Sequence, residues 1–183
     1  MSGEASDGAI VRAVLAGDVD QYAVLVRRYQ DRYARFAARM LGSVDAAEDA
    51  VQEAFIRAYE QLEQCREPDN FIGWFFLILR NRCLAAERQA KGTVDLESIG
   101  ELPAAEPADR RAEAADEGAA LERALRQLTP EQREVFVLRH VEDWSYEEIA
   151  QRTGISVAAL KMRMHRSYER LRELLGHLWD GSP

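Results

Sequence analysis

Cysteine and histidine are scarce in this 183-residue chain, which contains two cysteines and three histidines. Cys65 and Cys83 are too few, and too far apart in sequence, to form a zinc motif. Two ordinary thiols in a reducing cytosol are the better interpretation, and a disulfide between them is the alternative. His140, His165 and His177 have no carboxylate or cysteine partners at a useful spacing. Because a nucleophile–base pair and a phosphate loop are also missing, we expect no catalysis, no cofactor and no metal.

Long apolar runs are missing as well. The apolar run at residues 71–79 (FIGWFFLIL) falls far short of the ~20 residues that cross a bilayer, and the N-terminus has no apolar signal core. We therefore expect a cytoplasmic protein without membrane insertion. Convincing alternation of polar and apolar residues is also absent, so we expect no sheet.

The charge of the chain is negative and unevenly distributed. The net charge is −8, and an acidic chain is repelled overall by DNA phosphates. Residues 92–118 contain eight acidic residues and two arginines, whereas residues 156–175 contain five cations and two acidic residues. Any DNA affinity must therefore come from a local basic surface or from another molecule. The acidic stretch is rich in Ala, Glu, Pro and Gly and cannot bury enough apolar surface to fold, which predicts a flexible linker.

Apolar residues recur at helical spacing on both sides of this linker. The pattern predicts an all-α fold of two small helical domains, at residues 1–91 and 119–183. Helices are predicted at residues 9–15, 18–40, 45–62, 70–91 and 119–128, and again after a cap at Thr129 and a proline at Pro130. In the 45–62 helix we expect these side chains to face inward: Ala46, Ala50, Val51, Phe55, Ile56 and Tyr59.

Residues 144–175 have the pattern of a helix-turn-helix. Ser145 and Glu148 form a capping box, Gly154 stands where a C-cap needs a left-handed backbone, and Ser156 caps the next helix. That second helix combines an apolar stripe with cations that lie mostly off it, the geometry that enters a DNA major groove. The stripe consists of Val157, Leu160, Met164, Leu171 and Leu175, and the cations are Lys161, Arg163, Arg166, Arg170 and Arg172.

Three stretches resemble the extracytoplasmic-function (ECF) group of sigma-70 factors, which retain only sigma regions 2 and 4. Residues 45–59 resemble the region 2 signature, residues 71–84 the following promoter-binding helix, and residues 128–139 with the helix-turn-helix resemble region 4. The resemblance implies an initiation factor that directs core RNA polymerase to promoters and assists melting. Its expected partners are promoter DNA, the clamp helices of the largest polymerase subunit and the flap of the second-largest. An anti-sigma factor is a further candidate partner.

The resemblance also assigns roles within the first domain. Asp49, Gln52 and Glu53 fall on the surface that docks on the clamp helices, where carboxylates and an amide can meet arginines. An exposed Trp74 would stack on an unpaired base, and a buried one would belong to the core. Asn81 has a similar alternative, as a satisfied core amide. The candidates for the minus-ten element are Asp69, Asn70, Trp74, Arg80, Asn81 and Arg82.

In the helix-turn-helix, the resemblance places the minus-thirty-five element against the second helix. Arg166 and Arg170 fit phosphate contacts, which position without specifying sequence. Family members commonly have threonine where Ala159 stands and serine where Met162 stands, so base specificity here is open. Met162 would contact a thymine methyl or form part of a partner surface. The candidates are Ser156, Ala158, Ala159, Lys161, Met162, Arg163, Arg166 and Arg170.

Two other functions compete with the initiation factor. An autonomous helix-turn-helix regulator would bind duplex DNA without polymerase, but the acidic total and the lack of a clear dimer seam count against it. A polymerase-binding protein without promoter recognition is the second alternative, which the altered Ala159 and Met162 keep open.

Overall fold

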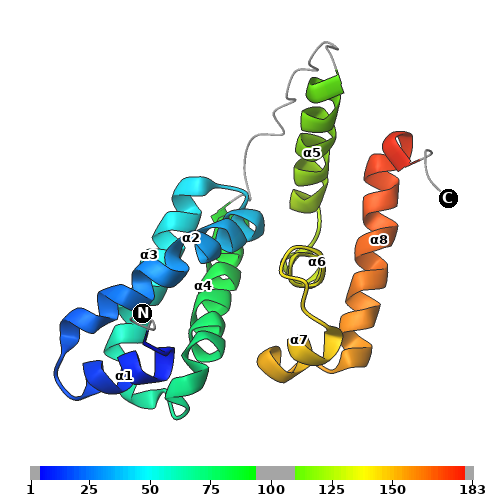
Figure 1. The fold of residues 1–183 in the computed structure, drawn as a ribbon. Coiled ribbons are helices and arrows are strands. Elements are labelled where there is room, and N and C mark those ends of the chain that lie inside the picture. The colour runs from blue at the N-terminus through cyan, green and yellow to red at the C-terminus, as the bar shows by residue number, and fades with distance from the viewer. Residues whose placement is uncertain (1–4, 94–109, 180–183) are drawn as a thin grey trace. The chain divides into compact units, whose positions relative to one another are not determined.

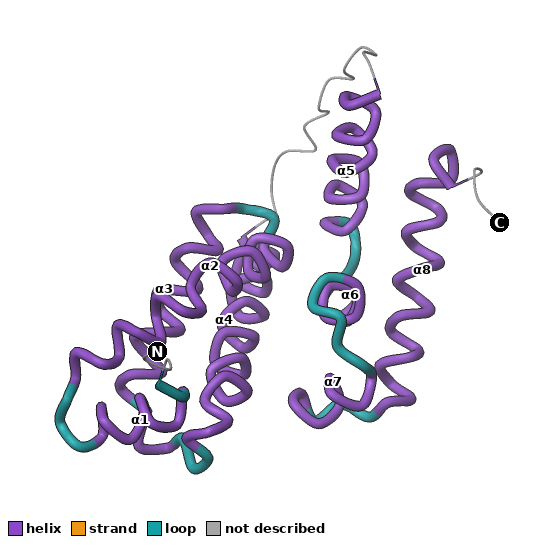
Figure 2. Tube along the Cα trace, in the orientation of Figure 1, coloured by secondary structure: helices purple, strands orange, loops and turns teal. Residues whose placement is uncertain are grey.

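The computed structural model describes the backbone of residues 5–93 and 110–179, and the side chains of residues 5–90 and 118–176. All regular elements in these ranges are helices, as expected, and no strand occurs among them (Figures 1 and 2). The chain divides into two compact units, here called unit 1 (residues 1–86) and unit 2 (residues 87–183). Each unit has its own core and is considered by itself.

Unit 1 contains three helices and the larger part of a fourth, whose residues 87–93 fall in unit 2, and its helix ends follow local chemistry. The Ser6 hydroxyl accepts a hydrogen bond from the Ala9 amide, and the Ser43 hydroxyl accepts one from the Ala46 amide. Gly42 has a φ of 69°, the left-handed conformation that ends a helix. The helices are α1 (Asp7–Leu15), α2 (Tyr22–Leu41), α3 (Val44–Glu60) and α4 (Phe71–Thr93), with single 3₁₀ turns at Val19–Gln21, Leu62–Gln64 and Pro68–Asn70.

The core of unit 1 is aromatic. The apolar run at residues 71–79 supplies Phe71, Phe75 and Phe76, all of which are buried. The Phe75 ring stacks on Phe55 of α3 with centroids 4.2 Å apart, and Phe76 meets Phe36 of α2 edge to face at 5.4 Å. Each such pair contributes about 0.5–1.5 kcal/mol beyond the apolar area that it buries. The run is therefore a core helix segment that ties α4 to both α2 and α3.

The buried face of α3 differs from the predicted one. Ala50, Val51 and Phe55 are buried as expected, but Ala46, Ile56 and Tyr59 are exposed. The buried positions that the prediction missed belong to small residues, which allow α3 to pack against α2. These are Ala47, Ala54 and Ala58. The prediction followed side-chain size, whereas the packing uses alanines and leaves Ile56 with 51% of its surface exposed.

Unit 2 contains α5 (Arg110–Arg126), α6 (Pro130–His140), α7 (Tyr146–Thr153) and α8 (Val157–Trp179). The cap predicted at α6 is present. The Gln132 amide donates to the Thr129 hydroxyl at 3.3 Å, and the Gln132 side chain accepts from the Thr129 amide at 3.0 Å.

Both ends of the predicted linker at residues 92–118 are helical in the structure. Residues 92 and 93 belong to the end of α4, and α5 begins at Arg110, nine residues before the predicted start at Ala119. Residues 94–109 lie outside the described part of the chain. The prediction failed at 110–118 because it rested on the scarcity of large apolar residues, although alanine, arginine and glutamate are strong helix formers.

The end of α5 is held by a buried arginine. Arg133 of α6 is only 3% exposed and donates from Nε to the Leu125 carbonyl at 2.9 Å and from Nη2 to the Arg126 carbonyl at 3.0 Å. The last carbonyls of a helix lack partners within the helix and carry partial negative charge, so a guanidinium there is well placed. Arg133 thereby fixes the turn between α5 and α6.

Candidate nucleic-acid and protein interfaces

The helix-turn-helix of unit 2 forms through the predicted local signals. The Glu148 amide donates to the Ser145 hydroxyl at 3.1 Å, and the Ser145 amide donates to the Glu148 carboxylate at 2.7 Å. The Ser145 hydroxyl also donates to this carboxylate, at 2.9 Å, and the bonds from the Ser145 amide and hydroxyl hold the pKa of the Glu148 carboxyl below its ordinary value. Gly154 has a φ of 73°, and the Ser156 hydroxyl accepts from the Ala159 amide at 3.3 Å. The sequence therefore specifies the angle at which α8 leaves α7.

One side of α8 is buried as predicted, with an addition. Leu160, Met164, Leu171 and Leu175 are buried, while Val157, at the first turn, is half-buried. Ser167 completes the stripe. It is fully buried, and its hydroxyl has two acceptors within hydrogen-bond distance, the Arg163 carbonyl at 2.8 Å and the Gln132 carbonyl at 3.1 Å. An apolar pattern could not identify this serine, because its place in the core depends on acceptors from α6 and α8.

The opposite side of α8 presents most of the predicted minus-thirty-five residues. Ser156, Ala158, Lys161, Met162, Arg166 and Arg170 are exposed, whereas Ala159 and Arg163 are half-buried. Arg170 pairs with Glu173 at 2.8 Å, which neutralises part of its charge. His165 was not predicted, yet its side chain is 73% exposed on the same side of the helix. Helical spacing alone identifies it, because it lies one turn from both Met162 and Lys161.

An aromatic side chain lies beside the cations of this surface. Lys161 Nζ and the Arg139 guanidinium carbon each lie 5.9 Å from the centroid of the Tyr146 ring, the outer limit of a cation–π contact. Arg152 lies closer to Trp144, at 4.5 Å. These contacts connect α7 with its neighbours and place Lys161 at the edge of the exposed side.

In unit 1, the minus-ten candidates lie at two places along α4. Asp69 and Asn70 precede the helix and are exposed, and Trp74 is half-buried beside Phe71. Asn81, two turns further along the same side of the helix, is exposed, which removes the core-amide interpretation. Arg80 is half-buried and donates to the Asn81 amide oxygen at 3.4 Å. Trp74 is neither fully buried nor fully exposed, so part of its ring is accessible.

The Asp69 carboxylate is held by α1. Arg12 donates to its two oxygens at 3.2 and 3.3 Å. Gly8 allows this approach, because a Cβ added there would lie 1.9 Å from Asp69 Oδ1. Sequence reasoning missed Arg12 as a partner of this loop, since the two residues are 57 positions apart.

The structure also joins two candidate sets that the sequence kept apart. Glu53 of the predicted polymerase surface pairs with Arg82 of the predicted DNA surface, with Nη2 2.9 Å from Oε1 and Nε 2.5 Å from Oε2. Both residues line a cavity of about 340 Å³ between α3 and α4, together with Asn81. Asp49, one turn before Glu53, and Gln52 are exposed and do not line this cavity.

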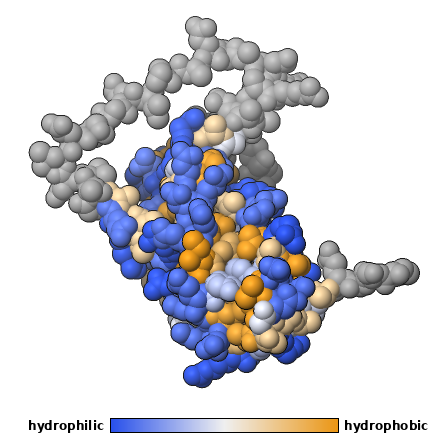
Figure 3. Space-filling model, turned by 90° about the vertical axis from the view of Figure 1, so that its left-hand side faces the viewer, coloured by the Kyte–Doolittle hydropathy of each residue, from blue (hydrophilic) through white to orange (hydrophobic). Residues whose placement is uncertain are grey.

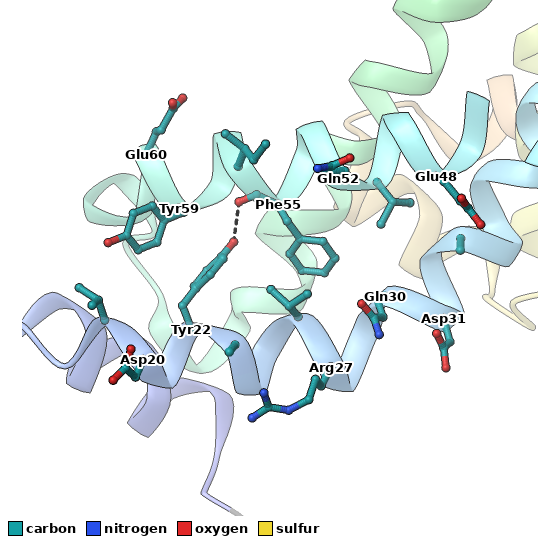
Figure 4. A pocket seen from close by; sticks show the side chains of 16 residues that line it. Asp20, Tyr22, Arg27, Gln30, Asp31, Glu48, Gln52, Phe55, Tyr59 and Glu60 are labelled. Carbon is teal, nitrogen blue, oxygen red and sulfur yellow. Dashed lines mark hydrogen bonds between the residues drawn. The ribbon is translucent and has the colours of Figure 1, made fainter. Parts of the chain in front are cut away.

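A larger groove runs between α2 and α3, with a volume of about 1240 Å³. In Figure 4, Tyr22 spans the groove and donates to the Phe55 carbonyl, at 2.7 Å, and Tyr59 lies beside it. Burial raises the pKa of the Tyr22 phenol, so it stays protonated. Ile56 and Val19 are exposed apolar residues of the wall, and Gln52 belongs to it as well. Figure 3 shows apolar side chains exposed among hydrophilic ones on the side of the molecule that carries α2 and α3.

Polar groups surround this apolar surface. Gln30, Asp31 and Glu48 lie toward one end of the groove, and Asp20 and Glu60 lie toward the other (Figure 4). An apolar strip with carboxylates at its rim is suited to binding a helix that carries both apolar and basic side chains.

None of the helices in the described ranges combines the length and the apolar character that a membrane span requires.

Comparison with known proteins identifies the family. The model of sigma-70 region 2 matches residues 25–93, and that of sigma-70 region 4 matches residues 118–171. The RNA polymerase sigma factor CarQ of Myxococcus xanthus is 37% identical over 166 residues, covering 88% of this chain and 93% of the relative. The ECF RNA polymerase sigma factor SigE of Mycolicibacterium smegmatis is 35% identical over 182 residues, covering 94% of this chain and 70% of the relative.

A solved structure agrees with this assignment. The sigma factor RpoE of Bartonella quintana, determined in complex with the anti-sigma factor NepR, has a TM-score of 0.60 and 28% identity, covering 87% of this chain and 97% of that chain. The chain therefore belongs to the ECF group of RNA polymerase sigma factors, the non-enzymatic subunits that bind core polymerase and promoter DNA to direct transcription initiation.

Proposed function

We propose that the two units divide the work of this sigma factor. Unit 1 docks on the clamp helices of the largest polymerase subunit and captures unpaired bases of the minus-ten element. Unit 2 reads the minus-thirty-five duplex with α8 and contacts the flap of the second-largest subunit. The observation that carries the proposal is the exposed side of α8, where Lys161 and Arg166 stand opposite a buried stripe and α7 provides support.

The docking surface of unit 1 comprises Asp49, Gln52 and Glu53, extended by Ile56. These residues are exposed and lie on one side of α3, and Ile56 supplies the apolar contact that a carboxylate surface lacks. Interfaces gain most of their affinity from a few desolvated side chains, with charges steering the approach. The groove beside Ile56 extends the surface toward α2, where Tyr59 and Val19 add apolar area.

Capture of the minus-ten element involves the start of α4 and its exposed side. Asp69 and Asn70 present an acceptor and an amide just before α4, and Trp74, one turn into the helix, is partly accessible, a combination suited to one stacked, hydrogen-bonded base. Arg80 and Asn81 lie further along the helix, where they could contact the unpaired DNA strand next to the captured base. Melting is favoured because an unpaired base gains these contacts only in the open state.

An anti-sigma factor is a further proposed partner, supported by the complex in which the Bartonella relative was determined. The exposed apolar residues of the α2–α3 groove are a suitable target, and an inhibitor there would compete with polymerase. We also place the chain in the cytoplasm, because its polymerase and its promoters are there.

Run-off transcription tests the proposal. Purified core polymerase would transcribe a library of promoter fragments with the full chain, without it, and with Asp49→Arg or Lys161→Ala chains. We expect transcripts that depend on the chain and share two spaced upstream elements. Lys161→Ala should weaken use of the upstream element, while Asp49→Arg should lower transcription from every promoter alike.

Two results would contradict the proposal. Tight binding of duplex DNA without polymerase, with no chain-dependent transcripts, would indicate an autonomous regulator. Binding to polymerase without any promoter-specific transcript would indicate an interaction protein. Arg172→Ala, which removes a cation from the later turns of α8, is the matched control for Lys161→Ala and should leave promoter preference unchanged.

A further inference from the structure

The exposed side of α8 has an apolar side chain at its centre. Met162 exposes 59% of its surface, although most large hydrophobic residues of the described chain are at least partly buried. An α-helix turns about 100° per residue, so Met162 lies roughly half a turn from both Leu160 and Met164, which are buried. Its side chain therefore points directly away from the core of unit 2.

The residues around Met162 leave its tip accessible and surround it with positive charge. Ala158 lies one turn earlier on the same side and is too small to cover a longer neighbour. Lys161 and Arg166 flank the methionine and are exposed, and His165 follows it by three positions. Cations on both sides attract the two phosphate backbones of a duplex, so the side chain between them lies over the base edges.

We propose that Met162 contacts the C5-methyl group of one thymine in the minus-thirty-five element and thereby makes that position thymine-specific. This inference rests on the proposed function, in which α8 enters the major groove. There, the thymine methyl is the apolar group that a base pair presents, while every other distinguishing feature is a hydrogen-bond donor or acceptor. Methionine has no strong donor, and its flexible thioether adapts to a small apolar partner.

Deoxyuridine tests the contact, because it pairs like thymine but lacks the C5-methyl group. Holoenzyme assembled with the full chain would transcribe its preferred promoter, with each thymine of the upstream element replaced in turn by deoxyuridine. We expect one replacement to lower the initiation rate by about fourfold, the effect of losing one buried methyl group. The other replacements should change the rate by much less.

Two variants assign the effect to the side chain. With Met162→Ser, thymine and deoxyuridine at that position should support equal initiation, whereas Met162→Leu should retain most of the preference. Each holoenzyme is compared with itself, as the ratio of its initiation rates at the unsubstituted and the deoxyuridine-substituted promoter.

The possible results distinguish failure of the Met162–thymine contact from failure of the proposed sigma function. If transcription depends on the chain but no thymine replacement distinguishes wild type from Met162→Ser, the methyl contact is wrong and the sigma function stands. If Met162→Ser instead lowers the affinity for core polymerase, the exposed methionine is a protein contact and the inference is overturned. If no transcript depends on the chain, the methyl contact and the proposed sigma function are both contradicted.

Discussion

The candidate binding surfaces of unit 1 and unit 2 are formed by different kinds of interaction. In unit 2, short-range signals such as Ser145, Gly154 and Ser156 set the direction of α8 within a dozen residues. In unit 1, the candidate residues are fixed by pairs that are distant in sequence, such as Arg12 with Asp69. Short-range chemistry makes a recognition helix readable from sequence, whereas a surface assembled across helices becomes visible only after folding.

The largest test of this contrast is to remove the aromatic centre of unit 1. Phe75→Ala deletes a buried ring that stacks on Phe55, at an expected cost of about 3–5 kcal/mol in the free energy of unfolding of unit 1. Hydrogen exchange measured by mass spectrometry reports each unit separately. Protection in α2 to α4 should fall sharply, while protection in α6 to α8 stays unchanged. Ile56→Ala, at an exposed position, is the control and should cost no more than about 0.5 kcal/mol.

A smaller effect comes from the caps, which can be removed one unit at a time. Ser145→Ala should lower the stability of unit 2 by about 1 kcal/mol, because the Glu148 amide loses its acceptor. Ser43→Ala is its counterpart in unit 1, where the Ala46 amide loses its acceptor. Local exchange should report each loss in its own unit. Equal losses in both units from either variant would show that the units do not fold independently.

The pair between Arg12 of α1 and Asp69, the minus-ten candidate just before α4, is expected to matter for function more than for stability. Arg12→Gln breaks an exposed pair with Asp69, which costs no more than about 1 kcal/mol. Open-complex formation should nevertheless slow, because the carboxylate loses its orientation. Arg35→Gln, an equal charge change at an exposed position of α2, serves as the control. Identical open-complex rates for the two variants would show that Arg12 plays no specific part in open-complex formation.

The smallest effect is the pH dependence of the capping box that Ser145 and Glu148 form at the start of α7. Hydrogen bonds from Ser145 lower the pKa of Glu148, so its contribution is complete above the ordinary value of 4.5 and is lost as the pH falls through the lowered pKa. The Tm difference between wild type and Glu148→Gln should therefore shrink as the pH drops below 4.5. A difference that is constant with pH would show that the carboxylate charge plays no part in the cap.

The sequence predicted the fold class, the helix-turn-helix with its caps, and the sides of α8 that face core and solvent. It misassigned Ile56 and Tyr59, because large apolar residues are assumed to be buried unless a partner is known. It also missed the pairing of Glu53 with Arg82, which depends on how α3 lies beside α4. The start of α5 at Arg110 was lost because a helix without large apolar residues looks like a linker.

The affinity of the full chain for core polymerase is the most direct test of the division of work between the units. We predict that Ile56→Glu, on the exposed side of α3, weakens binding by at least about tenfold, the effect of losing a contact of about 1.4 kcal/mol. Lys161→Ala should leave this affinity unchanged while lowering transcription from the preferred promoter. Equal loss of polymerase affinity in both variants, or no loss with Ile56→Glu, would contradict the assignment of docking to unit 1 and promoter reading to α8.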